Sequence, residues 1–283
     1  MRAVVLVLAA AMLPAPASGE AGAAASAPAA TGPDANDTIT APPARLKLDP
    51  FYKKCLDANG LPVVSSAKVP DRALRAAAAI VRGMLARRPD ILKALVAGKV
   101  RLAVMAVSET TTDIPEHSDL KPKDHWDKRA RGLGATRWRP AVSCAEENLL
   151  GYRKDPYRGE SILVHEFAHT IHGMGLNVID KQFQPRLEKL YRQAMAKGLW
   201  KKTYAASNVS EYWAEGVQDW FECNLQADPP NGIHNHVNTR RELEAYDPNL
   251  AKRIAEVFGE TPWRWRDPAK QARRGGSGHP ESP

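Results

Sequence analysis

The chain has 283 residues, of which 43% are hydrophobic and 25% charged, so most of it is expected to fold around a core as one large or two small domains. The formal net charge is +8 at pH 7, but acidic residues interrupt the basic stretch Lys121–Arg139 and other cations lie near the C-terminus. We interpret this charge as solvated surface. A nucleic-acid-binding protein is disfavoured, because the sequence contains no recognition motif of that class.

The N-terminus has the features of an export signal. Met1 and Arg2 precede the apolar run Ala3–Leu13, and small residues follow as far as Gly19. This order predicts a secretory signal peptide over residues 1–19, with the mature protein secreted or periplasmic. The run is too short to span a bilayer, and no later segment reaches that length, so no membrane span is expected. Residues 20–44 are rich in Ala, Pro, Gly and Ser, which predicts a disordered linker.

Strand and helix signals begin after this linker. A short strand is predicted at Pro62–Val64, and the strongest strand signal, nearly continuous and β-branched, lies at Val100–Val107. Between them, one helix is predicted from a cap at Asp71 to Pro89 and a shorter one ends at Gly98. Their inward-facing positions recur every three or four residues: Leu74, Ala78, Val81 and Leu85 in the first, and Leu92, Leu95 and Val96 in the second.

The rest of the chain is dominated by helical patterns. The weakly periodic segment Ser108–Gly159 is long for a plain connection, so part of it is expected to line a cleft. Four helices are then predicted: Glu160–Gly173, Lys181–Lys197, Ser210–Leu225, and one with Asp247 as cap and Gly259 after its end. A few strands followed by many helices favours an α+β fold. We expect one folded domain over residues 45–268 and a disordered tail over residues 269–283.

The helix predicted at Glu160–Gly173 contains His165-Glu166-Phe167-Ala168-His169, which matches the pattern H-E-x-x-H. On a helix His165 and His169 lie one turn apart on the same face, where both imidazoles can bind one metal ion. Glu166 is turned about 100° away, near enough for its carboxylate to hold a water on that ion. The motif therefore predicts a catalytic metal site.

A catalytic zinc ion requires a third protein ligand and an open position. His172 is close in angle to the histidine pair, but it lies about 10.5 Å along the helix axis from His165, too far to share one ion. His172 is therefore expected beside the ligands or in the cleft. A metzincin site is excluded, because its last histidine would fall at Gly175.

Glu211 is the preferred third ligand, and Glu215, one helical turn later, can accept a hydrogen bond from a ligand imidazole. Two simpler interpretations stay open at this point. Asn208 and Glu211 can form a capping box, and Glu215 can be a solvated surface charge.

The motif HEFAH with the distant Glu211-Tyr212-Trp213-Ala214-Glu215 resembles the gluzincin metallopeptidases, most of all the lethal-factor-like branch that includes the Pro-Pro endopeptidases. The likeness covers roughly Glu160 to Asn224. It implies a zincin-like fold, with a small mixed sheet and an active-site helix, in which Val100–Val107 offers an edge to an extended peptide. The site roles that it implies are His165, His169 and Glu211 as ligands of one Zn²⁺, Glu166 as general base, Tyr204 as transition-state donor and Glu215 as a hydrogen-bond partner of the ligands.

The sequence thus predicts a secreted zinc metalloendopeptidase acting on peptide or protein substrates. The alternative is a non-catalytic exported binding protein with a structural zinc ion and a fourth protein ligand. The three cysteines, Cys55, Cys144 and Cys223, permit one disulfide and leave one thiol over.

Overall fold

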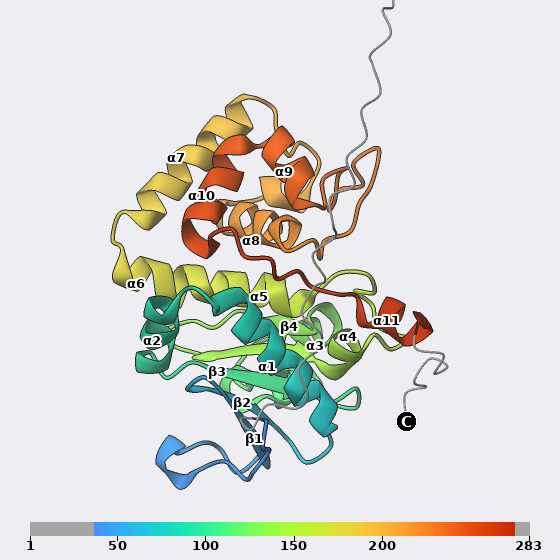
Figure 1. The fold of residues 1–283 in the computed structure, drawn as a ribbon. Helices are drawn as coiled ribbons and strands as arrows, with labels where there is room; N and C mark the ends of the chain where they lie inside the picture. The colour runs from blue at the N-terminus through green and yellow to red at the C-terminus, as the bar shows by residue number, and fades with distance from the viewer. Residues whose placement is uncertain (1–36, 275–283) are drawn as a thin grey trace, which may run out of the picture. The chain divides into compact units, whose positions relative to one another are not determined.

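The computed structural model describes residues 37–274, which belong to one compact unit (Figure 1). The predicted signal peptide, most of the predicted linker and the end of the predicted tail lie outside the described residues. Among those described, no helix is long and apolar enough to cross a bilayer.

A five-stranded mixed sheet forms one layer, in the order β1-β2-β3-β5-β4. Strands β2, β3 and β5 run parallel, whereas β1 and β4 each run antiparallel to their single neighbour. The bounds are Lys54–Ala58, Leu61–Ser65, Arg101–Met105, Gly132–Leu133 and Ala141–Ala145 for β1 to β5. The α+β class and the two predicted strands are confirmed. Strand β5 was missed, because its five buried residues show no alternation.

Strand β3, predicted as part of Val100–Val107, lies in the interior of the sheet. Its backbone pairs with β2 on one side and with β5 on the other. The expectation that this strand offers an edge to a peptide is therefore wrong. A nearly continuous apolar run is typical of a strand covered on both faces, so the same residues that made it easy to recognise also place it away from the edge. The edge beyond β5 belongs to β4.

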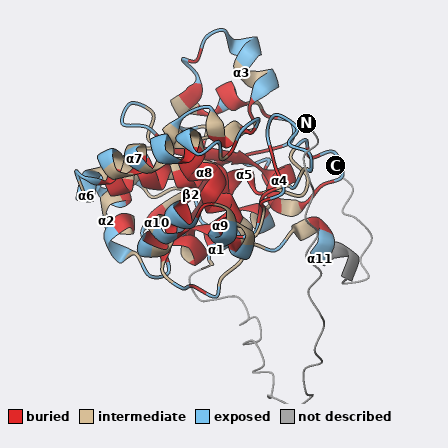
Figure 2. Ribbon diagram, turned by 90° about the horizontal axis from the view of Figure 1, so that it is seen from above, coloured by how far each residue is buried: buried red, intermediate tan, exposed pale blue. Residues whose placement is uncertain are grey.

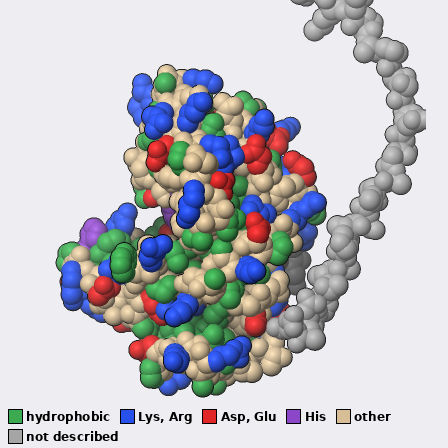
Figure 3. Space-filling model, turned by 90° about the vertical axis from the view of Figure 1, so that its left-hand side faces the viewer, with side chains coloured by type: hydrophobic (Ala, Val, Ile, Leu, Met, Phe, Trp, Pro, Cys, Tyr) green, Lys and Arg blue, Asp and Glu red, His purple; other side chains and the backbone are tan. Residues whose placement is uncertain are grey.

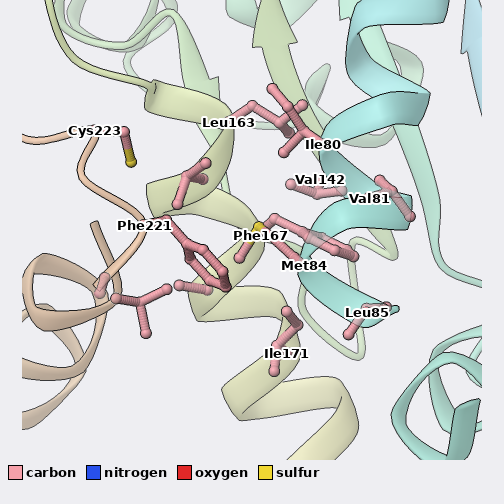
Figure 4. Packing of buried hydrophobic residues seen from close by; sticks show 14 of the residues in the cluster. Ile80, Val81, Met84, Leu85, Val142, Leu163, Phe167, Ile171, Phe221 and Cys223 are labelled. Atoms are coloured by element: carbon pink, nitrogen blue, oxygen red, sulfur yellow. The ribbon is translucent and has the colours of Figure 1, made fainter. Parts of the chain in front are cut away.

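Two helices cover one face of the sheet, α1 (Asp71–Leu85) and α5 (Ile162–Thr170) (Figure 1). In Figure 4, Phe167 of α5 points toward Met84 of α1, and Phe221 approaches from the other side. A smaller apolar cluster that includes Val64, Ala103 and Met105 is separate from this main core. Helix α5 thus lies between two groups of elements. The sheet and α1 pack on one side of it, and the helices that follow α5 in the sequence pack on the other.

Those later helices form a second layer (Figure 1). They are α7 (Phe183–Ala196), α8 (Val209–Trp220), α9 (Arg240–Tyr246) and α10 (Pro248–Phe258). Figure 2 shows that α5 and α8 are largely buried, whereas α7 and α9 present exposed faces. The shorter helical segments are Ala44–Leu46, α2 (Pro89–Ala97), Thr111–Asp113, Pro115–His117, α3 (Lys123–Arg129), α4 (Glu146–Leu150), the π-helical turn Ile171–Leu176, α6 (Asn177–Ile179), Tyr204–Ala206 and α11 (Pro268–Arg274).

Helix α10 begins and ends as predicted. The Asp247 carboxylate accepts a hydrogen bond from the backbone N–H of Leu250 at 3.1 Å, and Gly259 follows the helix with a φ of 68°. The other oxygen of Asp247 accepts from Trp200 Nε1 at 3.0 Å and from the Tyr212 hydroxyl at 2.7 Å. The cap therefore also ties α10 to α8.

Two details of the earlier helices differ from the sequence prediction. Asp71 is the first residue of α1 and not its cap, and its carboxylate binds Lys54 at 2.8 Å. In α2 the buried residues are Ile91 and Leu95, while Val96 is 40% exposed. A short helix has few apolar positions, so their periodicity alone does not decide which face is buried.

The ordered part of the chain is longer than predicted at both ends. Thr40 exchanges two backbone hydrogen bonds with Cys55, and Arg82 binds Asp37 at 2.7 Å, inside the predicted linker. In the predicted tail, α11 buries Ala269 against Gly151, where a Cβ would lie 2.4 Å from the backbone nitrogen of Ala269. Neither contact needs a large apolar side chain, which is why composition did not reveal them.

All three cysteines are buried free thiols, so the one disulfide that the sequence permits is not formed among the described residues.

Candidate metal centre

Helix α5 carries the H-E-x-x-H motif and begins at the cap Ser161, whose hydroxyl accepts from the backbone N–H of Val164 at 3.3 Å. The edge strand β4 lies directly against it. A Cβ at Gly132 would stand 2.7 Å from Ile162 Cγ2, and one at Gly134 would stand 2.9 Å from the Cβ of His169. Glycine is required at both positions because any side chain would push the strand off the helix.

The three predicted ligands converge on one point. Glu211 Oε2 lies 3.1 Å from the Nε2 atoms of both His165 and His169, and these two nitrogens lie 3.0 Å apart. Ligand atoms at about 2.0–2.1 Å from a tetrahedral zinc ion are separated by about 3.3 Å, so this near-equilateral triangle fits one such ion. Among the described residues, these three form the group of His, Cys, Asp and Glu side chains that can hold a metal ion.

Packing of α8 against α5 brings Glu211 to the histidines. Asn208 caps α8, accepting from the backbone N–H groups of Ser210 at 2.9 Å and Glu211 at 3.1 Å. Because the Glu211 carboxylate faces His165 and His169, it does not form a capping box with Asn208. The Asn208 side chain alone caps this end of α8.

The other imidazole nitrogens also meet partners on α8. His165 Nδ1 lies 2.7 Å from Gln218 Oε1 and 3.5 Å from Glu215 Oε1, and His169 Nδ1 lies 2.9 Å from Ser210 Oγ. Glu215, predicted as the partner of a ligand, is therefore near His165, but Gln218 is nearer. Sequence reasoning missed Gln218 and Ser210. The signal that could have found Gln218 is its spacing of seven residues from Glu211, which places both on one helix face.

Glu215 is also buried and not a solvated charge. The residue is 4% exposed, and its Oε2 accepts from Asn224 Nδ2 at 3.1 Å. The same amide donates to Asp219 Oδ1 at 2.9 Å. Burial, and then the neighbouring charge of Glu215, raise the pKa of Asp219 well above its ordinary value. The metal centre is thus bordered by a buried acidic pair.

Charges within the centre shift its titration strongly. Burial lowers the pKa of His165, but the Glu211 hydrogen bond and the charges of Glu166 and Glu215 together raise it to about 10. Burial raises the pKa of Glu211, but hydrogen bonds from His165 and His169 bring it far below its ordinary value. In the absence of an ion, the Glu211 carboxylate therefore stays ionised and a protonated imidazole balances its charge. Protons and a metal cation thus compete for the same ligand atoms.

Tyr204 and Glu166 border the ligand triangle. The Tyr204 ring stacks on His165 with centroids 6.3 Å apart and planes inclined by 24°. Burial, and then the charge of Glu211, raise the pKa of Tyr204, so its hydroxyl stays protonated as a donor. Glu166 is half-buried, and Gly134 leaves room beside it, since a Cβ there would lie 3.6 Å from Glu166 Oε2.

His172 lies apart from the ligands, in the π-helical turn. Its Nε2 is 2.6 Å from Gln184 Oε1, and its ring contacts Phe183 and Trp213 at centroid distances of 5.5 and 6.2 Å. Burial lowers its pKa to about 4, so the ring is neutral at physiological pH. These contacts make His172 a packing residue between α5, α7 and α8, and not the cleft residue that the sequence suggested.

Comparison with known proteins adds little beyond this geometry. No family model matches the sequence, and no curated protein matches it. The structure is similar to that of the PRO-PRO endopeptidase (PPEP-2) from Paenibacillus alvei, with a TM-score of 0.38 and 16% sequence identity over 71% of this chain and 98% of that chain.

Proposed function

We propose that this protein is a zinc-dependent metalloendopeptidase of the gluzincin type with a zincin-like catalytic domain. The observation that carries the proposal is the triangle of His165 Nε2, His169 Nε2 and Glu211 Oε2, with sides of 3.0–3.1 Å, bordered by Glu166 and Tyr204. When bound there, Zn²⁺ would polarise a scissile carbonyl and lower the pKa of a water molecule toward neutrality.

The two bordering residues have complementary tasks in this proposal. Glu166 takes a proton from the attacking water and delivers it to the nitrogen of the leaving amine. The Tyr204 hydroxyl, kept protonated by its raised pKa, donates a hydrogen bond to the developing oxyanion. One such preorganised donor contributes about 2–4 kcal/mol to the transition state.

An extended peptide suits the shape of the site. Strand β4 ends the sheet, and Gly132 in it and Gly134 just after it lie against α5, so its outer edge runs beside the proposed catalytic residues. Addition of a substrate strand to such an edge is a common mode of peptide recognition. The face drawn in Figure 3 is hollowed, and its Lys and Arg side chains are scattered among acidic and apolar ones, with no single basic patch that favours a nucleic acid.

The competing function is that of an exported binding protein with a structural zinc ion. A structural site is closed by four protein ligands. The candidate group has three members among the described residues, which leaves the fourth position for water and favours catalysis. Export itself is proposed from residues 1–19, and N-terminal sequencing of protein recovered from the secreted fraction tests it.

The decisive experiment combines metal analysis with an unbiased peptide-library digest. The wild type is expected to bind one zinc ion per chain and to cut peptides in a chelator-sensitive manner. Glu166→Gln is expected to keep the zinc and lose at least about 100-fold in activity, because the ligands remain while the general base is gone. Full activity in Glu166→Gln would overturn the mechanism, and zinc binding by a wild type that cuts no peptide would favour the structural alternative.

A further inference from the structure

We infer that Gln218 is a positioning residue that holds the His165 imidazole in the tautomer needed to bind the metal, and that Ser210 orients the His169 ring. The inference rests on the proposed metal site and adds residues that the sequence reasoning had not assigned. The expected hydrogen-bond partner of His165 was the carboxylate of Glu215, whereas Gln218 and Ser210 are neutral.

Gln218 is well placed for this task. Its side chain is 1% exposed and its Oε1 lies 2.7 Å from His165 Nδ1, against 3.5 Å for Glu215 Oε1. Its amide nitrogen donates to the backbone oxygen of Ser161 at 3.4 Å, which keeps Oε1 turned toward the imidazole. An amide oxygen can only accept, so His165 Nδ1 carries the proton and Nε2 presents a lone pair to the ion.

Ser210 completes the arrangement from the first turn of α8. Its hydroxyl lies 2.9 Å from His169 Nδ1, and its own backbone N–H is held by Asn208. A single helix therefore supplies the third ligand, Glu211, and a hydrogen bond to each of the other two. Displacement of α8 would change all three at once, so the metal affinity depends on how α8 docks.

The alternative is that Glu215 orients His165 electrostatically. Glu215 already accepts a hydrogen bond from Asn224 on its other oxygen, and its distance of 3.5 Å from Nδ1 is too long for a strong hydrogen bond. The two assignments differ in what removal of the Gln218 amide does. If Glu215 is sufficient, the loss of Gln218 leaves the affinity for zinc unchanged.

The test measures zinc affinity of the full chain by competition with a chromophoric chelator. Gln218→Leu is expected to weaken zinc binding about 10–100-fold, because the outer partners of metal-bound histidines contribute effects of that size. Gln218→Glu keeps an acceptor oxygen but loses the amide donor to Ser161, so it should restore part of the affinity. Gln193→Leu, an exposed glutamine on α7, is the matched control and should bind as the wild type does.

A spectroscopic readout separates positioning from a general loss of structure. In ¹⁵N-histidine-labelled, zinc-bound wild type, the proton on His165 Nδ1 should be observed and exchange slowly with solvent, and Gln218→Leu should accelerate that exchange. Ser210→Ala, at a half-buried position, should accelerate exchange at His169 alone and keeps the test usable if Gln218→Leu does not fold.

Wild-type affinity and slow exchange in both Gln218→Leu and Ser210→Ala would overturn the inference. Failure of the wild type to bind zinc would overturn the metal site and the inference together. Zinc binding without peptide cleavage would overturn only the proposed function, because affinity and proton exchange do not depend on catalysis.

Discussion

At the scale of single residues, the candidate centre assigns a different task to each of its carboxylates. Glu211 is half-buried and faces two imidazoles, Glu166 is half-buried beside Gly132 and Gly134, and Glu215 is buried next to an amide. Only the first completes the triangle of ligand atoms. His172, although it follows the motif closely in sequence, turns toward Gln184.

Replacement of Glu211 and of His172 should therefore have unequal effects on zinc binding. Glu211→Ala removes a ligand and is expected to weaken the affinity by more than about 100-fold, beyond the loss seen for outer partners. His172→Ala removes a packing contact and should leave the affinity nearly unchanged. Chelator competition measures both, and a larger loss in His172→Ala would make that histidine the ligand.

Tyr204→Phe keeps the ring stacked on His165 but removes the hydroxyl. We expect kcat to fall about 100- to 1000-fold, the cost of removing one oxyanion donor, while KM changes little. Steady-state kinetics on a cleaved peptide measure the two parameters. A raised KM with unchanged kcat would instead make Tyr204 a residue that only binds the substrate.

At the scale of secondary-structure elements, the proposed function depends on the contact between the edge strand β4 and the helix α5. Gly132 and Gly134 allow the two backbones to approach, and Ala135 N–H donates to the Thr170 hydroxyl at 2.9 Å to hold the strand beyond them. Substrate would add to this strand. The position of the substrate relative to the proposed catalytic residues therefore depends on Gly132 and Gly134, which have no side chains.

Gly132→Ala tests this contact. The added Cβ would lie 2.7 Å from Ile162 Cγ2 and 2.9 Å from the backbone oxygen of Ser143, so the strand must shift. We expect unfolding to become easier by about 1–3 kcal/mol, the usual cost of overpacking, with a loss of activity. Gly173→Ala is the matched control, because a Cβ there meets nothing within 4 Å. Equal stability of the two variants in urea denaturation would contradict the close contact.

The elements also show how far sequence reasoning reaches. Helix α10 was predicted from its cap to its last residue, because Asp247, Pro248 and Gly259 act through local backbone geometry. The motif and Glu211 were found because ligand chemistry restricts residue type and spacing. Strand β5 was missed because its five buried residues show no alternation. Gln218 shares a helix face with Glu211, but which way its amide turns is decided by its tertiary contacts with Ser161 and His165.

At the scale of the whole molecule, the buried Asp219 makes stability depend on pH. Its pKa is raised well above the ordinary value by burial and then by Glu215, and its Oδ2 has no hydrogen-bond partner among the described groups. The folded protein thus keeps a proton that the unfolded chain releases above about pH 4. Stability is consequently lost as the pH rises from there toward the folded-state pKa.

Asp219→Asn removes this penalty while preserving an oxygen that can accept from Asn224. The variant should be more stable than the wild type by a margin that grows with pH above about 4, at no more than about 1.4 kcal/mol per pH unit. Urea denaturation of the metal-free proteins between pH 4 and 7 measures the margin. A constant difference across that range would show that Asp219 is ionised in the folded state.

The docking of α8 on α5 has a consequence for how the protein is made. The donor atoms of His165 and Glu211 belong to residues 46 positions apart, so no local segment can bind the ion tightly. Closing that loop has an entropic cost that must be met before the three donors coincide, and such long-range contacts form late in folding. Zinc uptake during refolding should therefore not precede the docking of α8 on α5. A chain captured before that step would carry no zinc and would be unable to cut its neighbours.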